Sequence, residues 1–148
     1  MSEVGSSFRY GHEARHEDHE LDVEQCWSLL GSTGIGRFAF VDDGRVAVYP
    51  VRYLVHSGAL YFRTTPDGTV ARGLPQGGVA LQLDAADPAT QSGWSVLVSG
   101  RAEAVHDSDE LTALFGEMVE EPWAGGVRDH FVRIDADRLT GRRVYLAR

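Results

Sequence analysis

Apolar and polar residues alternate through the middle of the chain, a pattern typical of half-buried strands. Residues 34–41 alternate in this way, and 45–55 do so again after the turn Asp42-Asp43-Gly44. Two such runs joined by an Asp-Gly turn predict a β-hairpin. We expect a kink at Pro50, because proline cannot donate a ladder hydrogen bond.

Five more short apolar runs, bounded by turn residues, predict five further strands. They cover residues 59–64, 79–84, 94–106, 131–134 and 139–146. Turns are expected at 56–58 and 135–138, and a polar loop at 84–93. Short strands joined in this way predict a mainly β fold, a small barrel of six or seven antiparallel strands.

Two helices are expected to flank the barrel. An apolar stripe from Val23 to Leu30 follows Asp22, a suitable N-cap, and stops at Gly31. A second helix is predicted over 108–118, with a capping box that begins at Ser108.

The first twenty residues lack any apolar periodicity, which predicts a mobile polar tail before one domain over 21–148. His12, His16 and His19 recur there at the spacing of one helix face, a pattern that also suits metal ligands. Zinc ligands need rigid support from a surrounding shell, so a solvated tail is the favoured interpretation.

Composition narrows the class of protein. The 148 residues suffice for one domain with a core, and the net charge of −8 argues against a nucleic-acid partner. Cys26 is the only cysteine, is expected in the core, and fits a reducing cytoplasm. No apolar run reaches the length of a membrane span and no export signal is recognised, so a cytoplasmic location is expected.

The segment 59–83 carries the clearest binding signal. Arg63 and Thr64 end a predicted strand, and Thr69 and Arg72 follow a Pro-Asp-Gly turn. Hydroxyl, backbone and guanidinium donors around one turn suit a phosphate group. No nucleophile motif or other catalytic side chain is predicted beside them.

A flavin also needs an apolar slot for its ring. Arg52 and Tyr53 on a neighbouring strand could flank such a ring, and Trp94 and Ser95 begin another strand. The same residues allow a plainer interpretation, in which Tyr53 and Trp94 are barrel core and Arg63 is a solvated strand end.

Several short motifs occur in a characteristic order along residues 21–144. Together they resemble the pyridoxamine 5′-phosphate oxidase-like proteins with the FMN-binding split-barrel fold, in the actinobacterial branch near the nitroimidazole-resistance reductases. The motifs are Cys26-Trp27-x-Leu29-Leu30, Gly36-Arg37-Phe38-Ala39-Phe40, Pro50-Val51-x-Tyr53, Phe62-Arg63-Thr64, Gly93-Trp94-Ser95-Val96-Leu97-Val98-x-Gly100-x-Ala102 and Thr140-Gly141-Arg142-Arg143.

This resemblance implies a homodimer with two flavin sites at the subunit interface. It places the strand of Val51, Arg52 and Tyr53 along the flavin ring, and Arg63-Thr64 with the following turn at the phosphate. Trp94, Ser95 and Arg142 are implied to come from the partner chain. FMN is the implied cofactor, and a deazaflavin coenzyme is the alternative.

The chain departs from the family pattern at two positions. Val70 stands where the family commonly has a lysine on the phosphate, and Arg52 stands where asparagine is usual. Loss of such an ammonium contact costs about 1.5–3 kcal/mol, so Val70→Lys is predicted to tighten FMN binding. The substrate-binding pattern of the oxidase itself is not visible, which argues against pyridoxamine phosphate oxidation.

The leading hypothesis is therefore an FMN-binding oxidoreductase that transfers hydride to a small organic molecule. The alternative is a non-catalytic flavin- or deazaflavin-binding or sensing module with a weakened phosphate site. A third hypothesis is haem binding, with His56, His106 or His130 as axial ligand.

Overall fold

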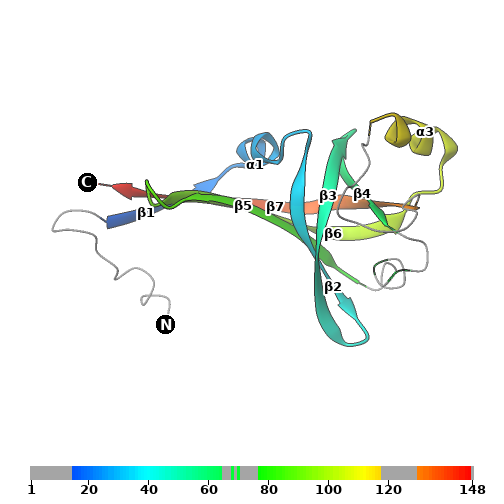
Figure 1. Cartoon of the computed structure of the whole chain (residues 1–148), viewed down its shortest axis with the longest axis horizontal. Coiled ribbons are helices and arrows are strands. Elements are labelled where there is room, and N and C mark those ends of the chain that lie inside the picture. The colour runs from blue at the N-terminus through cyan, green and yellow to red at the C-terminus, as the bar shows by residue number, and fades with distance from the viewer. Residues whose placement is uncertain (1–14, 65–67, 69, 71–76, 118–129, 148) are drawn as a thin grey trace.

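One closed antiparallel sheet forms the body of the protein. The computed structural model describes residues 15–64, 68, 70, 77–117 and 130–147. In these ranges seven strands follow the order β1-β7-β4-β3-β2-β5-β6, and β6 also pairs with β7, which closes a barrel (Figure 1). The expected mainly β fold with a barrel of antiparallel strands is confirmed. The strands are β1 (Arg15–Leu21), β2 (Thr33–Asp42), β3 (Arg45–His56), β4 (Ala59–Thr64), β5 (Val79–Asp87), β6 (Ser92–Ala104) and β7 (His130–Ala147).

The described helices are α1 (Val23–Leu30) and α3 (Ser108–Glu117), which lie apart from each other, with α3 near one end of the molecule (Figure 1). Asp22 caps α1 as predicted, because its side chain accepts a hydrogen bond from the Gln25 N–H at 2.8 Å. At α3 the Asp107 carboxylate, rather than Ser108, accepts from the Glu110 N–H at 2.9 Å. Neither of these helices is long and apolar enough to cross a membrane.

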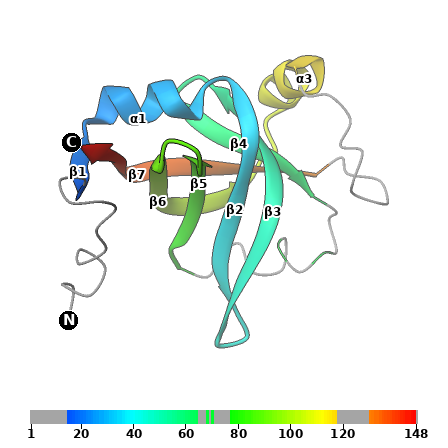
Figure 2. The same ribbon diagram turned by 60° about the vertical axis from the view of Figure 1, so that its left-hand side comes forward.

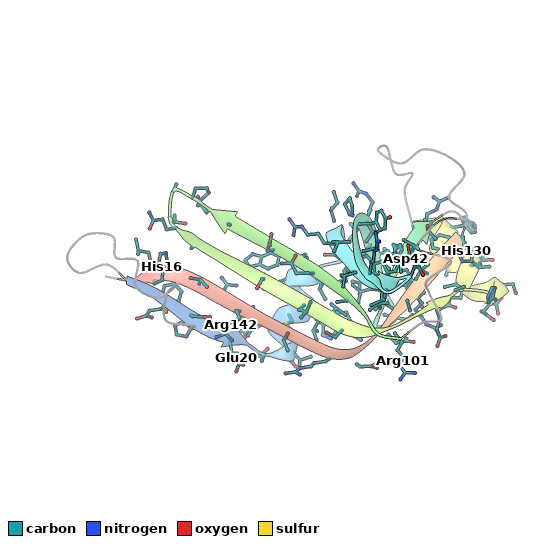
Figure 3. All side chains as sticks on the ribbon, turned by 90° about the horizontal axis from the view of Figure 1, so that it is seen from below. His16, Glu20, Asp42, Arg101, His130 and Arg142 are labelled. Atoms are coloured by element: carbon teal, nitrogen blue, oxygen red, sulfur yellow. The ribbon has the colours of Figure 1, made fainter. Side chains whose placement is uncertain are left out.

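Beyond the barrel, β1, β7, β6 and β5 lie side by side as an extended sheet, which we call the arm (Figure 3). The prediction of an irregular tail is wrong from Arg15 onward, because β1 pairs with β7 along its whole length. Arg142 Nε also donates to both carboxylate oxygens of Asp18, to Oδ1 at 3.0 Å and to Oδ2 at 3.1 Å. Charged residues are typical of an edge strand, and they hide it from a search for apolar periodicity.

The strand geometry of β1 also rules out the shared helix face on which the histidine metal site was based. His16 and His19 lie on a strand, where residues three apart point to opposite faces. His19 stacks on Tyr145 with ring centroids 5.2 Å apart. Among the described residues no group of three or more His, Cys, Asp or Glu side chains is placed to hold a metal ion, and His12 lies outside those residues.

The hairpin of β2 and β3 matches the prediction, and the kink expected at Pro50 does not interrupt its pairing. Arg37 pairs with Pro50 within a continuous register. On the other side of β3, β4 pairs only with Leu54–His56. Proline is tolerated because Pro50 lies outside that short pairing.

The two C-terminal strands predicted around 135–138 are one strand, β7. The expected turn there is a bulge against β6, where the register shifts between Ser99 and Gly100. Gly100 is required at this point, because an added Cβ would lie 1.8 Å from the Asp135 carbonyl oxygen. Strand β5 likewise continues to Asp87, into the segment expected to be a loop.

Two apolar clusters fill the interior. The main core lies inside the barrel and includes Cys26, as predicted, and Val70. Tyr53 is 1 % exposed and its hydroxyl donates to the Leu30 carbonyl at 2.6 Å, which ties β3 to the end of α1. A second cluster packs α3 against β4 and β7 through residues that include Leu114 and Phe131.

Candidate functional site

The sheet opens between β3 and β4, and two arginines lie on either side of the opening. Pairing of these strands stops at Leu54 and Tyr61. Continued in the same register, the next outward-facing positions are Arg52 on β3 and Arg63 on β4. We call this opening, with Arg52 and Arg63 beside it, the split.

Arg63 is held between aromatic rings at the edge of the split. Its guanidinium carbon lies 5.5 Å from the centroid of Phe115 on α3 and 5.6 Å from that of Phe131 on β7. The two rings meet edge to face, with centroids 4.9 Å apart. Cation–π contacts of this kind help to hold a guanidinium in one position.

Polar contacts anchor α3, which carries Phe115. The Tyr61 hydroxyl donates to the Glu110 carboxylate at 2.5 Å, and Arg133 Nη1 donates to the same carboxylate at 3.2 Å. Burial is the main cause that raises the pKa of Tyr61 to about 12, and the bond to Glu110 adds to it. The neutral phenol therefore persists across the physiological range and keeps α3 in place over β4.

Arg52 supplies a buried polar group that needs a partner. Its Nε is buried and, among the residues that the structure describes, has no hydrogen-bond partner. Buried donors are satisfied in most native structures, and an unpaired one loses free energy. An anionic or carbonyl-bearing ligand in the split would satisfy this donor, so the split fits the phosphate or ring edge of a flavin.

The other residues predicted near the split, Val51, Tyr53 and Thr64, are buried. Val51 and Tyr53 point into the core, and burial raises the pKa of Tyr53 to about 12. The predicted ring-flanking role therefore does not fit the Tyr53 side chain, although its backbone lies on β3 beside the split. Thr64 is 5 % exposed at the end of β4.

The phosphate turn itself is only partly described. Thr69 and Arg72 lie outside the described residues. Val70 is 9 % exposed and belongs to the main core, so its side chain packs inward rather than toward a ligand. Packing explains why a valine suits this position.

The other predicted residues, Trp94, Ser95 and Arg142, lie together on the arm. Ser95 pairs with Arg142 across β6 and β7, and Trp94 is half-buried against the main core. Two hollows of about 490 and 540 Å³ adjoin here, and Ser95 and Arg142 line both. Arg142 is charged and exposed, and the contacts with Asp18 raise its pKa further.

A single chain does not bring the split and these arm residues together. Arg63 pairs with Phe131 near the start of β7, whereas Ser95 pairs with Arg142 eleven residues further along. Eleven residues of extended strand span roughly 35 Å. Arg142 lies on the arm, whereas His130 lies at the far side of the barrel (Figure 3).

Reasoning from the sequence missed the aromatic pair around Arg63 and two residues of the arm. Phe115 and Phe131 belong to elements far from Arg63 in the chain, so no local pattern could indicate them. Arg138 and Thr140 line the larger hollow with Arg142. Their alternation could have been recognised as one face of a strand, had 135–138 not been interpreted as a turn.

Comparison with known proteins agrees with this architecture. The family model described as pyridoxamine 5′-phosphate oxidase matches residues 22–143. The chain belongs to this family. The match covers the barrel, α1 and most of the arm, and it confirms the resemblance carried by the sequence motifs.

Individual proteins are similar to this chain over most of their length. The uncharacterized protein Rv0080 of Mycobacterium tuberculosis is 32 % identical over 143 residues, which cover 93 % of each chain. An FAD-binding protein of Mycobacterium smegmatis is 26 % identical, with a TM-score of 0.66 over 86 % of this chain and 98 % of that one. An FAD-binding protein of Mesorhizobium loti shares the fold, at 24 % identity and a TM-score of 0.73 over 85 % and 97 % of the two chains.

Proposed function

We propose that this protein binds a flavin at the split and acts as an oxidoreductase on a small organic molecule. The single observation that carries the proposal is the buried, unpartnered Arg52 Nε beside an opening of the sheet. Membership of the pyridoxamine 5′-phosphate oxidase family and the similarity to a flavin-binding mycobacterial protein support it. When bound, a flavin accepts and donates hydride at its ring.

The residues of the split then have separate tasks. Arg63, oriented by Phe115 and Phe131, directs positive charge toward the flavin phosphate. Arg52 donates from its buried Nε to the ring edge or the adjoining chain of the cofactor. Val51 and Tyr53 hold the β3 backbone in place by packing inward, so that strand stays rigid beneath the ligand.

A homodimer is part of the proposal, because the arm residues implied for the site lie far from the split of their own chain. The outer face of the β2–β3 hairpin supports it, since large apolar side chains are exposed there. Ile35, Val46 and Val48 are 52 %, 75 % and 57 % exposed. A second copy that covers this face would bury them and bring its own Trp94, Ser95 and Arg142 toward the split.

Three cofactors are compatible with this arrangement, and titration separates them. FMN follows from the motif resemblance, FAD is suggested by the mycobacterial relative, and a deazaflavin coenzyme is the third. Purified protein is titrated with each while flavin fluorescence and absorbance are followed. Micromolar binding of one of them is expected, and a protein that ignores all three would refute the proposal.

Variants connect that binding to the split. Arg52→Gln and Arg63→Gln are each expected to weaken binding about ten- to a hundredfold, because each removes a charged hydrogen bond. Arg101→Gln, an exposed arginine on β6, is the matched control. For the dimer, Val48→Glu is expected to yield monomers in sedimentation velocity and to weaken flavin binding together with association.

The inward packing of Val70 favours a second candidate, a flavin-binding module without turnover. The phosphate turn then lacks the family's lysine and holds its ligand weakly. The two candidates differ in one measurement, the rate at which a chemically reduced flavin on the protein is reoxidised by added nitroaromatic or quinone acceptors. Acceleration over free flavin supports the oxidoreductase, and an unchanged rate supports the module.

A further inference from the structure

The larger hollow of the arm is lined by Arg138 and Thr140, which have no part in the proposed flavin site. Its volume is about 540 Å³, and we call it the arm groove. Leu97 pairs with Thr140 and Ser99 pairs with Arg138 across β6 and β7, in the same register as Ser95 and Arg142. Directly paired residues point to the same side of a sheet, so these side chains share one outer face. The lining residues used below are Ser95, Leu97, Arg138, Thr140, Arg142 and Glu20.

The two arginines of the arm groove differ in their charge environment. Arg142 Nε contacts Asp18 at 3.0 Å and its Nη1 lies 4.0 Å from Glu20, so its charge is largely balanced. Arg138 is exposed and, within the part of the chain that the structure describes, has neither a hydrogen bond nor an ion pair. One cation in this groove is therefore available to a ligand.

The neighbours of Arg138 indicate the chemistry of that ligand. Thr140 and Ser95 offer hydroxyl groups, and Leu97 offers an apolar surface that is 41 % exposed. Glu20 and Asp18 lie nearby and would repel a dianion. A monoanionic carboxylate with an apolar body matches this combination better than a phosphate does.

We propose that the arm groove binds the carboxylate of a small organic acid through Arg138, with Thr140 and Ser95 as hydroxyl donors and Leu97 against the apolar part. That this acid is the molecule on which the flavin acts rests on the proposed function. Within one chain the groove lies far from the split, so the acid would reach a flavin at the split of the second copy. Direct pairing connects Pro50, Arg37, Gln82, Leu97 and Thr140 in one row. The groove and the strand expected along the flavin therefore share the outer face of the sheet.

The test uses benzoate and its neutral analogue benzamide as probes of the full chain, with binding followed by NMR chemical-shift changes or calorimetry. Benzoate is expected to bind at least tenfold more tightly than benzamide, because a charge-assisted bond to arginine is lost in the amide. Arg138→Gln is expected to remove this preference, and Arg138→Lys to retain part of it. Arg101→Gln, an exposed arginine on the neighbouring strand β6 and outside the groove, is expected to leave it unchanged.

Equal binding of benzoate and benzamide, or a preference that survives in Arg138→Gln, would overturn the proposal. So would an equal loss in Arg101→Gln, since that result reports general charge rather than a site. Flavin titration of the same proteins separates this inference from the proposed function. If the unaltered protein prefers benzoate in a way that depends on Arg138 but does not bind flavin, the arm groove is supported and the flavin site is refuted. If Arg138→Gln binds flavin normally but no longer prefers benzoate, both proposals are supported.

Discussion

The guanidinium of Arg63 lies 5.5 Å from the ring of Phe115, so a residue of α3 orients a residue at the edge of the split. Phe131 completes the contact from β7. Strand β4, helix α3 and the first half of β7, whose ribbons are drawn in Figure 2, each contribute one side chain to this contact. The position of α3 is in this way coupled to the charge offered at the split.

Removal of this ring is expected to loosen Arg63. Phe115→Ala should weaken flavin binding about two- to fivefold, because an exposed cation–π contact contributes roughly 0.5–1 kcal/mol. Phe115→Tyr keeps an aromatic face and serves as the control. Fluorescence titration of both variants measures the effect, and an equal affinity of the alanine variant and the unaltered protein would show that Phe115 does not position Arg63.

Tyr53 provides a separate prediction about stability. Tyr53→Phe should lower the free energy of unfolding by about 1–2 kcal/mol, since the Leu30 carbonyl loses its buried donor. Flavin affinity should stay the same, because the hydroxyl faces the core. Tyr49→Phe, whose ring is 41 % exposed, is the matched control in chemical denaturation.

The same phenol predicts how stability depends on alkaline pH. Burial raises the pKa of Tyr53 to about 12, above its ordinary value near 10. The neutral form is therefore favoured in the folded state, and its contribution is complete below about pH 10 and falls as pH rises toward 12. The decline in unfolding free energy over this range should be shallower in Tyr53→Phe. Identical slopes for the two proteins would contradict the assignment.

A substitution at Val70 distinguishes inward packing of this side chain from the phosphate-binding position predicted from the family pattern. Val70→Lys is expected to lower stability by about 2–3 kcal/mol, because an ammonium is brought into the main core. It is not expected to tighten FMN binding, in contrast to the interpretation from the family pattern. Val70→Ala is the comparison, and a lysine variant at least as stable as the alanine variant would show that the side chain reaches solvent.

Strand β1 is expected to stabilise the arm. A chain that begins at Asp22 should be less stable than one that begins at Arg15 by about 2 kcal/mol or more, since it loses seven residues of pairing with β7 and the packing of Leu21. Thermal unfolding of the two proteins measures the difference. Equal midpoints would mean that this pairing adds nothing to the stability of the folded chain.

Much of the fold was predictable because its elements are local. The alternation in β2 and β3, the Asp-Gly turn between them, and the cap at Asp22 each depend on residues close together in the chain. Cys26 was predicted in the core from its place in an apolar stripe. The ordered motifs added the family, since their glycines and aromatic residues occupy positions where the barrel allows few alternatives.

Long-range contacts decided the rest. Strand β1 carries charged residues throughout and is recognisable only beside β7, more than a hundred residues away. The direction of Val70 and Tyr53 into the core, the unpartnered Arg52 Nε and the aromatic rings around Arg63 depend on how distant strands close the barrel. Local periodicity and turn spacing were enough to predict the class of fold, and the order of the short motifs carried the resemblance to the family. Which side chains face the split and the arm groove became clear only in the folded structure, because that depends on the register between strands that are far apart in the chain.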